Sequence, residues 1–296
     1  MTIPTGSAFI NALVSGLLLG GLFAVTALGL SLVFGVMRLI NLVHGELIVF
    51  GAYLALELTR HSHVTPLLTI VVVAPVLFLV AAPVQRLLLE PLMAKGPEPA
   101  LLTTFGLSVI AQNLFVLVWS GDVQSLPARY ATGAVKVLGL RIADMYLISF
   151  AVALVLCGLL HLMLQRTRLG LRIRASSEDA EVSDALGVDV RRVHLFVYGL
   201  AAACAAIGGV LVGITFSFTP TTGLTYLLTG FAVVVLGGLG SVKGTLLGAL
   251  LLGVIESVGG AFFGDGYRDF IGFVAFLIVL SVRPQGLFGR QEAVRQ

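Results

Sequence analysis

Three polar residues and a glycine interrupt an apolar stretch near the start of the sequence. Residues 36–53 read VMRLINLVHGELIVFGAY, and among them stand Asn41, His44, Gly45 and Glu46. An amide, an imidazole and a carboxylate this close together could border the path of a polar solute or pass a proton. Since the surrounding residues are apolar, the chemistry depends on whether this group lies inside a membrane.

The chain has the composition of a polytopic membrane protein. Hydrophobic residues make up 58% of it and charged residues only 11%, against about 25% charged in a soluble domain. Its mean hydropathy is +1.05. Several uncharged runs reach the roughly 20 residues that a helix needs to cross a bilayer. Because these runs lack the alternation of a transmembrane barrel, we predict an all-α helical bundle.

Nine segments are candidate crossings, so we expect about eight to ten transmembrane helices. The segments cover residues 8–37, 39–59, 64–84, 100–120, 145–165, 193–217, 224–242, 245–263 and 268–282. Glycines spaced four apart, such as Gly16 and Gly20, are typical of closely packed membrane helices. No low-complexity linker divides the chain, and we expect residues 1–296 to form a single transmembrane domain.

The basic residues predict an orientation for the bundle. With the N-terminus outside and nine crossings, thirteen Lys and Arg residues fall on the cytoplasmic side and five on the other. An excess of basic residues in cytoplasmic loops is the usual arrangement. We therefore expect the N-terminus outside and the C-terminus in the cytoplasm. The net charge of +3 follows from the same bias and does not indicate a nucleic-acid partner.

Glu46 would then lie deep in the second crossing. At 1.5 Å per residue it stands about 12 Å along the helix axis from Arg38, inside a hydrocarbon core about 30 Å thick. A charge at that depth costs roughly 2.5–3.5 kcal/mol, so it should face the bundle interior, a partner or water. Gly45 weakens the helix there, and we expect a broken helix beside a polar cavity. The alternative is that Glu46 lies at the membrane interface.

A second carboxylate, Glu256, is centred in the apolar run at residues 244–263. It could be held by a structural hydrogen bond or line a solute pathway, and the sequence favours neither. Together with His44 and Glu46, it could also form the proton relay of a secondary transporter.

The connector at residues 166–192 is the longest hydrophilic segment on the predicted cytoplasmic side. Four arginines precede Ser177 in it, and an acidic run then leads to Gly187. Ser177 before the acidic residues and Gly187 after them predict a short capped helix along the membrane surface. Such a helix offers both signs of charge to a soluble partner. The alternative is an anchoring loop that reflects only the positive-inside bias.

The sequence contains no recognisable catalytic apparatus. Residues 237–245, GGLGSVKGT, differ from a phosphate-binding loop because Val242 stands where that motif needs a glycine before the lysine. We therefore expect no enzymatic activity and no cofactor or metal in this chain. ATP and Mg²⁺, if used, would be bound by a separate subunit.

Motifs distributed over nearly the whole chain match one known family. They are ALGLSLVFGV (27–36), RLINLVHGE (38–46), GAY (51–53), RTRLG (166–170), VVLGGLGSVKG (234–244) and RPQGLFG (283–289). In these motifs the chain resembles the membrane subunits of bacterial branched-chain amino acid ABC transporters, of the LivH type. The resemblance implies the type II-like architecture of ABC importer permeases and a place in the bacterial inner membrane.

The resemblance also implies partners and a coupling segment. A LivM-like second permease subunit or another copy of this chain, two cytoplasmic ATP-binding subunits and an external solute-binding protein would complete the importer. Residues Glu181 to Gly187 are similar to the E-x-x-x-x-x-G part of the segment that couples such permeases to their ATPases, with Val182 and Ser183 in place of alanines. The residues implied in coupling are Arg174, Glu178, Glu181, Asp184, Ala185 and Gly187.

The function expected from these features is translocation of branched-chain or other hydrophobic amino acids, as one subunit of an ATP-driven importer. Asn41, His44, Gly45, Glu46 and Glu256 are the candidate pathway residues. A permease for urea or short amides, a proton-coupled secondary transporter and a channel for a small neutral solute are the alternatives.

Overall fold

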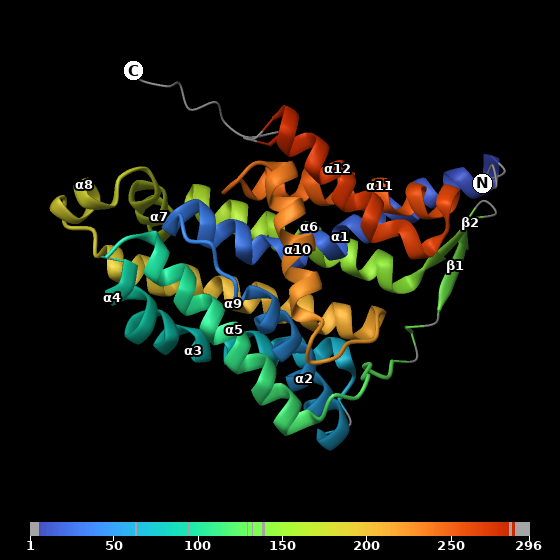
Figure 1. The fold of residues 1–296 in the computed structure, drawn as a ribbon, viewed down its shortest axis with the longest axis horizontal. Coiled ribbons are helices and arrows are strands. Elements are labelled where there is room, and N and C mark those ends of the chain that lie inside the picture. The colour runs from blue at the N-terminus through green and yellow to red at the C-terminus, as the bar shows by residue number, and fades with distance from the viewer. Residues whose placement is uncertain are drawn as a thin grey trace.

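The structure is a computed structural model that describes residues 6–62, 64–93, 95–128, 130–131, 133–137, 140–283 and 286–287. Helices dominate it, as the sequence predicts. The described residues also contain a short antiparallel hairpin of β1 (Ala134–Val137) and β2 (Leu140–Ala143). The longest helices run beside one another along the long axis of the molecule (Figure 1).

Each of the nine expected crossings contains a helix. These are α1 (Gly6–Met37), α2 (His44–Ser62), α3 (Ile70–Val84), α5 (Pro97–Trp119), α6 (Asp144–Arg166), α9 (Val190–Thr215), α10 (Gly223–Gly237), α11 (Val242–Phe263) and α12 (Arg268–Val282). Within the described residues, six helical stretches are long and apolar enough to cross a bilayer: α1, α5, α6, α9, α11 and the stretch that contains α3. The helices α2, α10 and α12 are shorter or more polar.

The helical stretch that contains α3 is longer than the sequence predicts. It begins at η1 (Pro66–Thr69) and continues past Val84 through a π-helical turn, η2 (Gln85–Leu89), into α4 (Glu90–Met93). The segment between the crossings predicted at 64–84 and 100–120 is therefore largely helical. Three leucines follow Arg86 and keep the stretch apolar, so a boundary placed at the first charged residue ended the helix too early.

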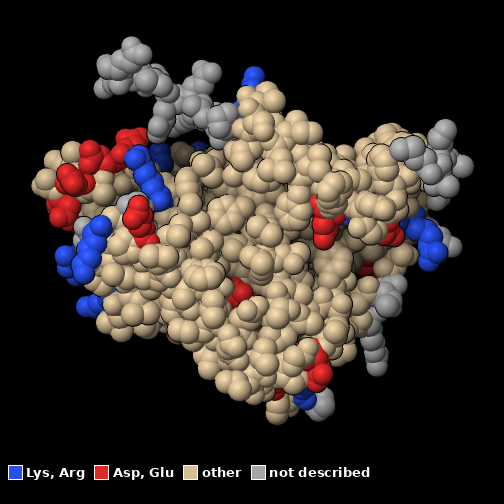
Figure 2. Space-filling view, viewed as in Figure 1, with Lys and Arg blue, Asp and Glu red and all other residues tan. Residues whose placement is uncertain are grey.

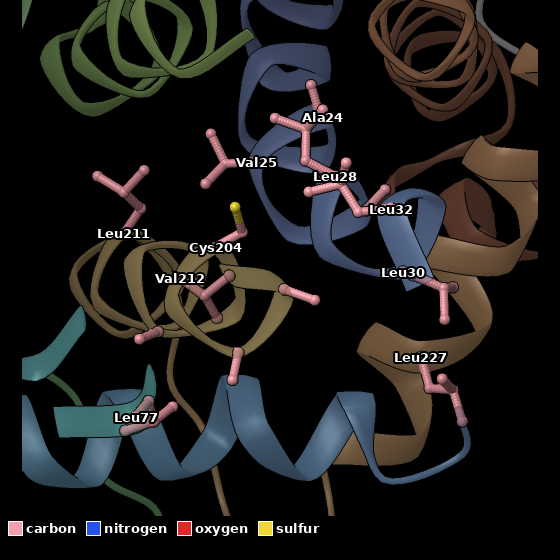
Figure 3. Packing of buried hydrophobic residues seen from close by; sticks show 14 of the residues in the cluster. Ala24, Val25, Leu28, Leu30, Leu32, Leu77, Cys204, Leu211, Val212 and Leu227 are labelled. Carbon is pink, nitrogen blue, oxygen red and sulfur yellow. The ribbon is translucent and has the colours of Figure 1, made fainter. Parts of the chain in front are cut away.

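Helix α1 forms the centre of the bundle. It packs against α6, α9, α10 and α11, and most of its residues from Leu18 to Val33 are buried. Val25 of α1 points toward Cys204 and Leu211 of α9 (Figure 3). Because lipid is as apolar as these side chains, close packing rather than escape from water holds such helices together.

Two of the glycines in the predicted packing pattern lie where α1 packs against α11. A Cβ atom on Gly20 would lie 2.6 Å from the carbonyl oxygen of Ala249 in α11, and one on Gly16 would lie 2.7 Å from the Cβ atom of Ser257. The absence of side chains therefore lets the two backbones meet, which confirms the predicted role of Gly16 and Gly20 in helix packing.

On the face shown in Figure 2, most charged side chains lie toward the ends of the long axis, and few lie on the broad surface between them. At one end lie α4, α7 (Arg168–Glu178) and α8 (Ala180–Ala185), whereas the β1–β2 hairpin lies at the other (Figure 1). The connector at 166–192 and the hairpin are therefore separated by the length of α6, as expected of segments on opposite sides of a membrane.

The connector at 166–192 contains two helices rather than one, and the predicted N-cap is wrong. Ser177 lies within α7, where its hydroxyl donates to the carbonyl of Arg174 at 2.8 Å. Asp179 caps α8 instead, since its carboxylate accepts the N–H of Val182 at 3.0 Å. Serine and aspartate are both good N-caps, and the sequence pattern alone did not show which of the two residues caps the helix.

The predicted stop at Gly187 is confirmed. This glycine has a φ of 87°, the left-handed region that residues with a Cβ atom avoid. Its N–H donates to the carbonyl of Asp184, and the N–H of Val188 donates to that of Ser183. These two bonds are those of a Schellman motif, which ends a helix at a glycine.

Candidate functional site

The predicted break lies between α1 and α2, a few residues earlier than Gly45. Residues 38–43 are not helical, and Arg38 has a φ of 49°, an uncommon conformation for a residue with a side chain. The segment turns back along the molecule, so α2 begins near the middle of the long axis (Figure 1). Gly45 belongs to the first turn of α2 and does not interrupt it.

A threonine of α5 supports the non-helical segment. The N–H of Leu42 donates to the Thr104 hydroxyl at 3.3 Å, and that hydroxyl lies 3.5 Å from the carbonyl oxygen of Ile40. Thr104 is itself buried. Irregular backbone at membrane depth needs protein partners of this kind, because lipid offers none.

Gly45 brings the N-terminus of α2 against that of α10. A Cβ atom on Gly45 would overlap the carbonyl oxygen of Gly223, which is the first residue of α10. The two glycines therefore let the helices touch backbone to backbone. Each helix N-terminus carries a partial positive charge, so this junction favours a negative group beside it.

Glu46 supplies that negative group. A Cβ atom on Gly223 would lie 2.6 Å from its Oε1 atom and 2.7 Å from its Oε2 atom, so the carboxylate fills the space that a side chain would occupy. Oε1 accepts the hydroxyl of Ser108 in α5 at 3.3 Å, whereas Oε2 is buried without a hydrogen-bond partner. Glu46 thus faces the bundle interior, as the sequence predicts.

His44 and Asn41 are both completely buried beside this junction. The Nε2 atom of His44 lies 2.9 Å from the carbonyl oxygen of Thr26 in α1, so that nitrogen carries the proton that it donates. This bond ties the start of α2 to α1. The amide of Asn41 has no hydrogen bond of regular geometry, although it lies beside the hydroxyl of Tyr198 in α9.

Glu256 lies apart from this group. It belongs to α11 and packs against α12, where a Cβ atom on Gly272 would lie 2.6 Å from its Oε1 atom. In the described part of the chain, no hydrogen bond joins Glu256 to His44 or Glu46. The three residues therefore do not form a continuous hydrogen-bonded relay.

A cavity of about 430 Å³ opens between α2, α3, α5 and α9. Glu46 and Tyr198 border it, and apolar side chains such as Phe50, Val80 and Leu114 make up the rest of its wall. The sequence predicts a polar cavity beside Glu46, whereas the structure has a largely apolar one. The lining combines four helices, a combination that no local pattern reveals.

A larger groove of about 940 Å³ lies at the end of the molecule that carries α7 and α8. The end of α1, Arg38 directly after it, and parts of α4 and α9 complete its lining. Of the predicted coupling residues, it contains Glu178, Glu181 and Asp184; Arg174, Ala185 and Gly187 lie outside it on or beside the same two helices. The groove places Glu181 and Asp184 of the predicted coupling segment in one lining with Arg38, where the break starts.

A polar cluster of Gln85, Glu90 and His194 joins α4 to α9 along this groove. The Oε2 atom of Glu90 accepts the side-chain amide of Gln85 at 3.0 Å and lies 3.6 Å from the Nδ1 atom of His194. Both Gln85 and His194 are buried. Removal of the carboxylate would leave their polar groups without this partner.

We therefore expect the Glu90→Ala variant to be less stable by about 1–3 kcal/mol, because two buried polar side chains lose a partner. Thermal unfolding of the purified protein in detergent measures the effect. Glu98→Ala, which removes an exposed carboxylate in the first turn of α5, is the control. Equal midpoints for the two variants would show that Glu90 does not hold α4 against α9.

Comparison with known proteins decides the family. Residues 12–280 match the model of a family described as the permease component of branched-chain amino acid transport systems. The chain belongs to this permease family. The permease is thus a multi-pass membrane protein and one component of a transport system, and the predicted resemblance is confirmed.

Similar curated proteins span almost the whole permease. It is 31% identical to the high-affinity branched-chain amino acid transport system permease protein BraD of Pseudomonas aeruginosa, over 96% of this chain and 97% of that protein. It is 29% identical to the probable branched-chain amino acid transport permease protein LivH of Methanocaldococcus jannaschii, over 90% and 89% of the two chains. A ribose import permease protein, RbsC of Escherichia coli, is 36% identical over 32% of each chain. No solved structure matches.

Proposed function

We propose that this permease translocates branched-chain and other hydrophobic amino acids across the bacterial inner membrane, as a subunit of an ATP-driven importer. Its relatives carry the names of branched-chain amino acid permeases, which supports this class of solute over urea or short amides. In the proposed orientation the N-terminus lies outside, so α7 and α8 face the cytoplasm, where ATP is available.

An exposed apolar face on α8 is the observation that carries the ATP-driven mechanism. Val182 of α8 is 54% exposed, and Leu186, which directly follows α8, is 80% exposed. The two are four residues apart, the spacing of neighbours on one helix face. Acidic residues surround them, at the charged end of the molecule. An apolar spot in such a setting suits a soluble protein partner, and we assign it to the ATP-binding subunit.

The proposed complex contains further subunits that bind outside this chain. Two ATP-binding subunits would dock at the cytoplasmic end, a LivM-like permease or a second copy of this chain would pack beside the bundle, and a solute-binding protein would deliver the amino acid from outside. We propose that this chain itself catalyses no reaction. Arg38 and Glu181 line the same groove. A movement of α8 would therefore be transmitted across this groove to the break at residues 38–43.

We place the solute path beside Asn41, His44, Gly45 and Glu46, where two helix N-termini meet a buried carboxylate. Discontinuous helices of this kind form the substrate sites of other membrane transporters. Glu256 packs against α12 away from this junction, and we propose a structural role for it.

Uptake of radiolabelled leucine into proteoliposomes separates the proposed importer from its alternatives. The complex is purified through a tag on this chain. It should accumulate leucine only when ATP is supplied on the side of the membrane that carries the ATP-binding subunits and when the solute-binding protein is present on the other side. Accumulation driven by a pH gradient without ATP would identify a secondary transporter. Downhill flux with neither energy source would identify a channel, and both results would overturn the proposal.

A further inference from the structure

The cavity between α2, α3, α5 and α9 has one acidic end and an otherwise largely apolar wall. Its volume of about 430 Å³ lies in the range of small-molecule sites, about 300–1,000 Å³. Helices α2, α3 and α5 contribute apolar side chains, among them Phe50, Ala81 and Ala111, and α9 contributes Tyr198. Glu46 is the one ionisable carboxylate among the described residues that line it.

Glu46 has no cationic partner in the described part of the chain. Its side chain is only 4% exposed, its Oε1 atom accepts a hydroxyl from Ser108, and its Oε2 atom accepts nothing. None of the ion pairs formed by the described residues includes it. A buried carboxylate gains most from a positively charged group that donates hydrogen bonds, and a ligand can supply such a group.

An acidic end beside an apolar wall fits a ligand with a cationic head and an aliphatic body. A branched-chain amino acid has both, in its ammonium group and its side chain. We propose that Glu46 binds the ammonium group of the transported amino acid while the cavity wall holds its side chain. This inference rests on the proposed function, because it takes its ligand from the cargo.

The first turn of α10 completes the fit. Gly223, Leu224 and Thr225 lie in that turn, where backbone N–H groups have no acceptor within their own helix. Gly223 lies against the Glu46 carboxylate, and the free N–H groups of a helix N-terminus can donate to the carboxylate of the same amino acid. One junction thus offers partners of opposite charge for the two ends of a zwitterion.

A lipid acyl chain is the competing occupant of the cavity. The outer surfaces of α3 and α5 carry exposed apolar residues such as Val80 and Leu114, so lipid reaches the wall. An acyl chain would leave the Glu46 carboxylate without a cation, which is why we assign the amino acid.

The Glu46→Gln variant tests the ammonium contact in the whole complex, without the solute-binding protein. Scintillation proximity binding should show an affinity for radiolabelled leucine about 10-fold or more below that of the wild type, since a hydrogen bond to a charged group is lost. 4-Methylpentanoate has the same side chain as leucine but no ammonium group. Its affinity, measured by competition, should be the same for the variant and the wild type. Equal affinity of the variant and the wild type for leucine would overturn the ammonium contact.

The Ala111→Leu variant tests the cavity wall and does not depend on the fate of Glu46. A larger side chain inside the cavity should weaken binding of leucine about 10-fold more than binding of alanine, because the longer substrate meets the added atoms. Gly106→Leu is the matched control on the same helix, since a Cβ atom at Gly106 would meet nothing within 4 Å. This control should bind both amino acids like the wild type.

The outcomes separate this inference from the proposed function. If the wild-type complex transports leucine with ATP but Ala111→Leu and Glu46→Gln both bind leucine and alanine like the wild type, the cavity is not the binding site and the function stands. Release of a co-purified lipid by Ala111→Leu with unchanged leucine binding would make the cavity a lipid site and overturn the inference. A wild-type complex that transports no amino acid would overturn both.

Discussion

Replacing Gly45 with alanine is expected to abolish transport by this permease. The added Cβ atom would overlap the carbonyl oxygen of Gly223 and lie 3.1 Å from the Cβ atom of Leu227. Backbone cannot rotate away as a flexible side chain can, so the first turns of α2 and α10 must separate. Overpacking of this kind costs about 1–3 kcal/mol, and it would also displace Glu46 from the junction that holds it.

The control for this variant is Gly158→Ala in α6. A Cβ atom there would meet nothing within 4 Å, and alanine favours the helix over glycine by about 0.5–1 kcal/mol. We expect ATP-dependent leucine uptake to fall below detection for Gly45→Ala and to stay at the wild-type rate for Gly158→Ala, at equal amounts of assembled complex. Uptake by Gly45→Ala at the wild-type rate would show that α2 and α10 can move apart without loss of function.

The Leu186→Glu variant is expected to uncouple the permease from ATP hydrolysis. Leu186 is 80% exposed at the end of α8, so the change should leave the fold intact while it places a charge in the proposed contact with the ATP-binding subunit. Residues at the centre of such contacts contribute about 2–4 kcal/mol. We therefore expect ATP-dependent uptake to fall about 100-fold.

Co-purification and thermal unfolding distinguish lost docking from lost folding. The ATP-binding subunit should no longer co-purify with Leu186→Glu, whereas the unfolding midpoint of the variant should match that of the wild type. Val123→Glu, which places the same charge at an exposed position in the connector after α5, is the control and should retain uptake. Retention of the ATP-binding subunit by Leu186→Glu would exclude α8 as its docking element.

Hydropathy predicted the helices well because each one consists of a continuous apolar run. Helix boundaries were harder to predict where a charged residue stands inside a longer apolar run. Arg86 marked the end of α3 in the sequence, but the leucines that follow it continue the helix to Met93. In the connector, Ser177 and Asp179 were both suitable N-caps, and the extension of α7 through Ser177 decided between them.

The candidate site was predicted in part. The polar residues from Asn41 to Glu46 indicated a broken helix and a buried carboxylate, and the structure contains both. The prediction could not locate the break or explain Gly45, since this glycine serves a contact with Gly223, far along the chain. For the same reason the apolar character of the cavity was missed: its wall depends on how four helices pack.

Glu256 shows what the sequence could not distinguish. A carboxylate in the middle of an apolar run resembles Glu46 in sequence, and both were candidates for one solute pathway. The structure separates them, because α11 turns Glu256 toward Gly272 of α12 while Glu46 faces Gly223 of α10. Composition shows that a buried charge needs a partner, but only tertiary packing shows which one it has.

Chemical access to the cavity is the most direct test of an ATP-driven permease. Leu47 lines the cavity. In a background without the two native cysteines (Cys157→Ser, Cys204→Ala), the reactivity of a Leu47→Cys variant therefore measures access of reagents to the cavity. We expect a membrane-impermeant thiol reagent added outside proteoliposomes to modify this cysteine at a rate that changes about 10-fold when the ATP-binding subunits bind ATP. An identical rate with and without ATP, in complexes that hydrolyse it, would contradict motor-driven movement of this path.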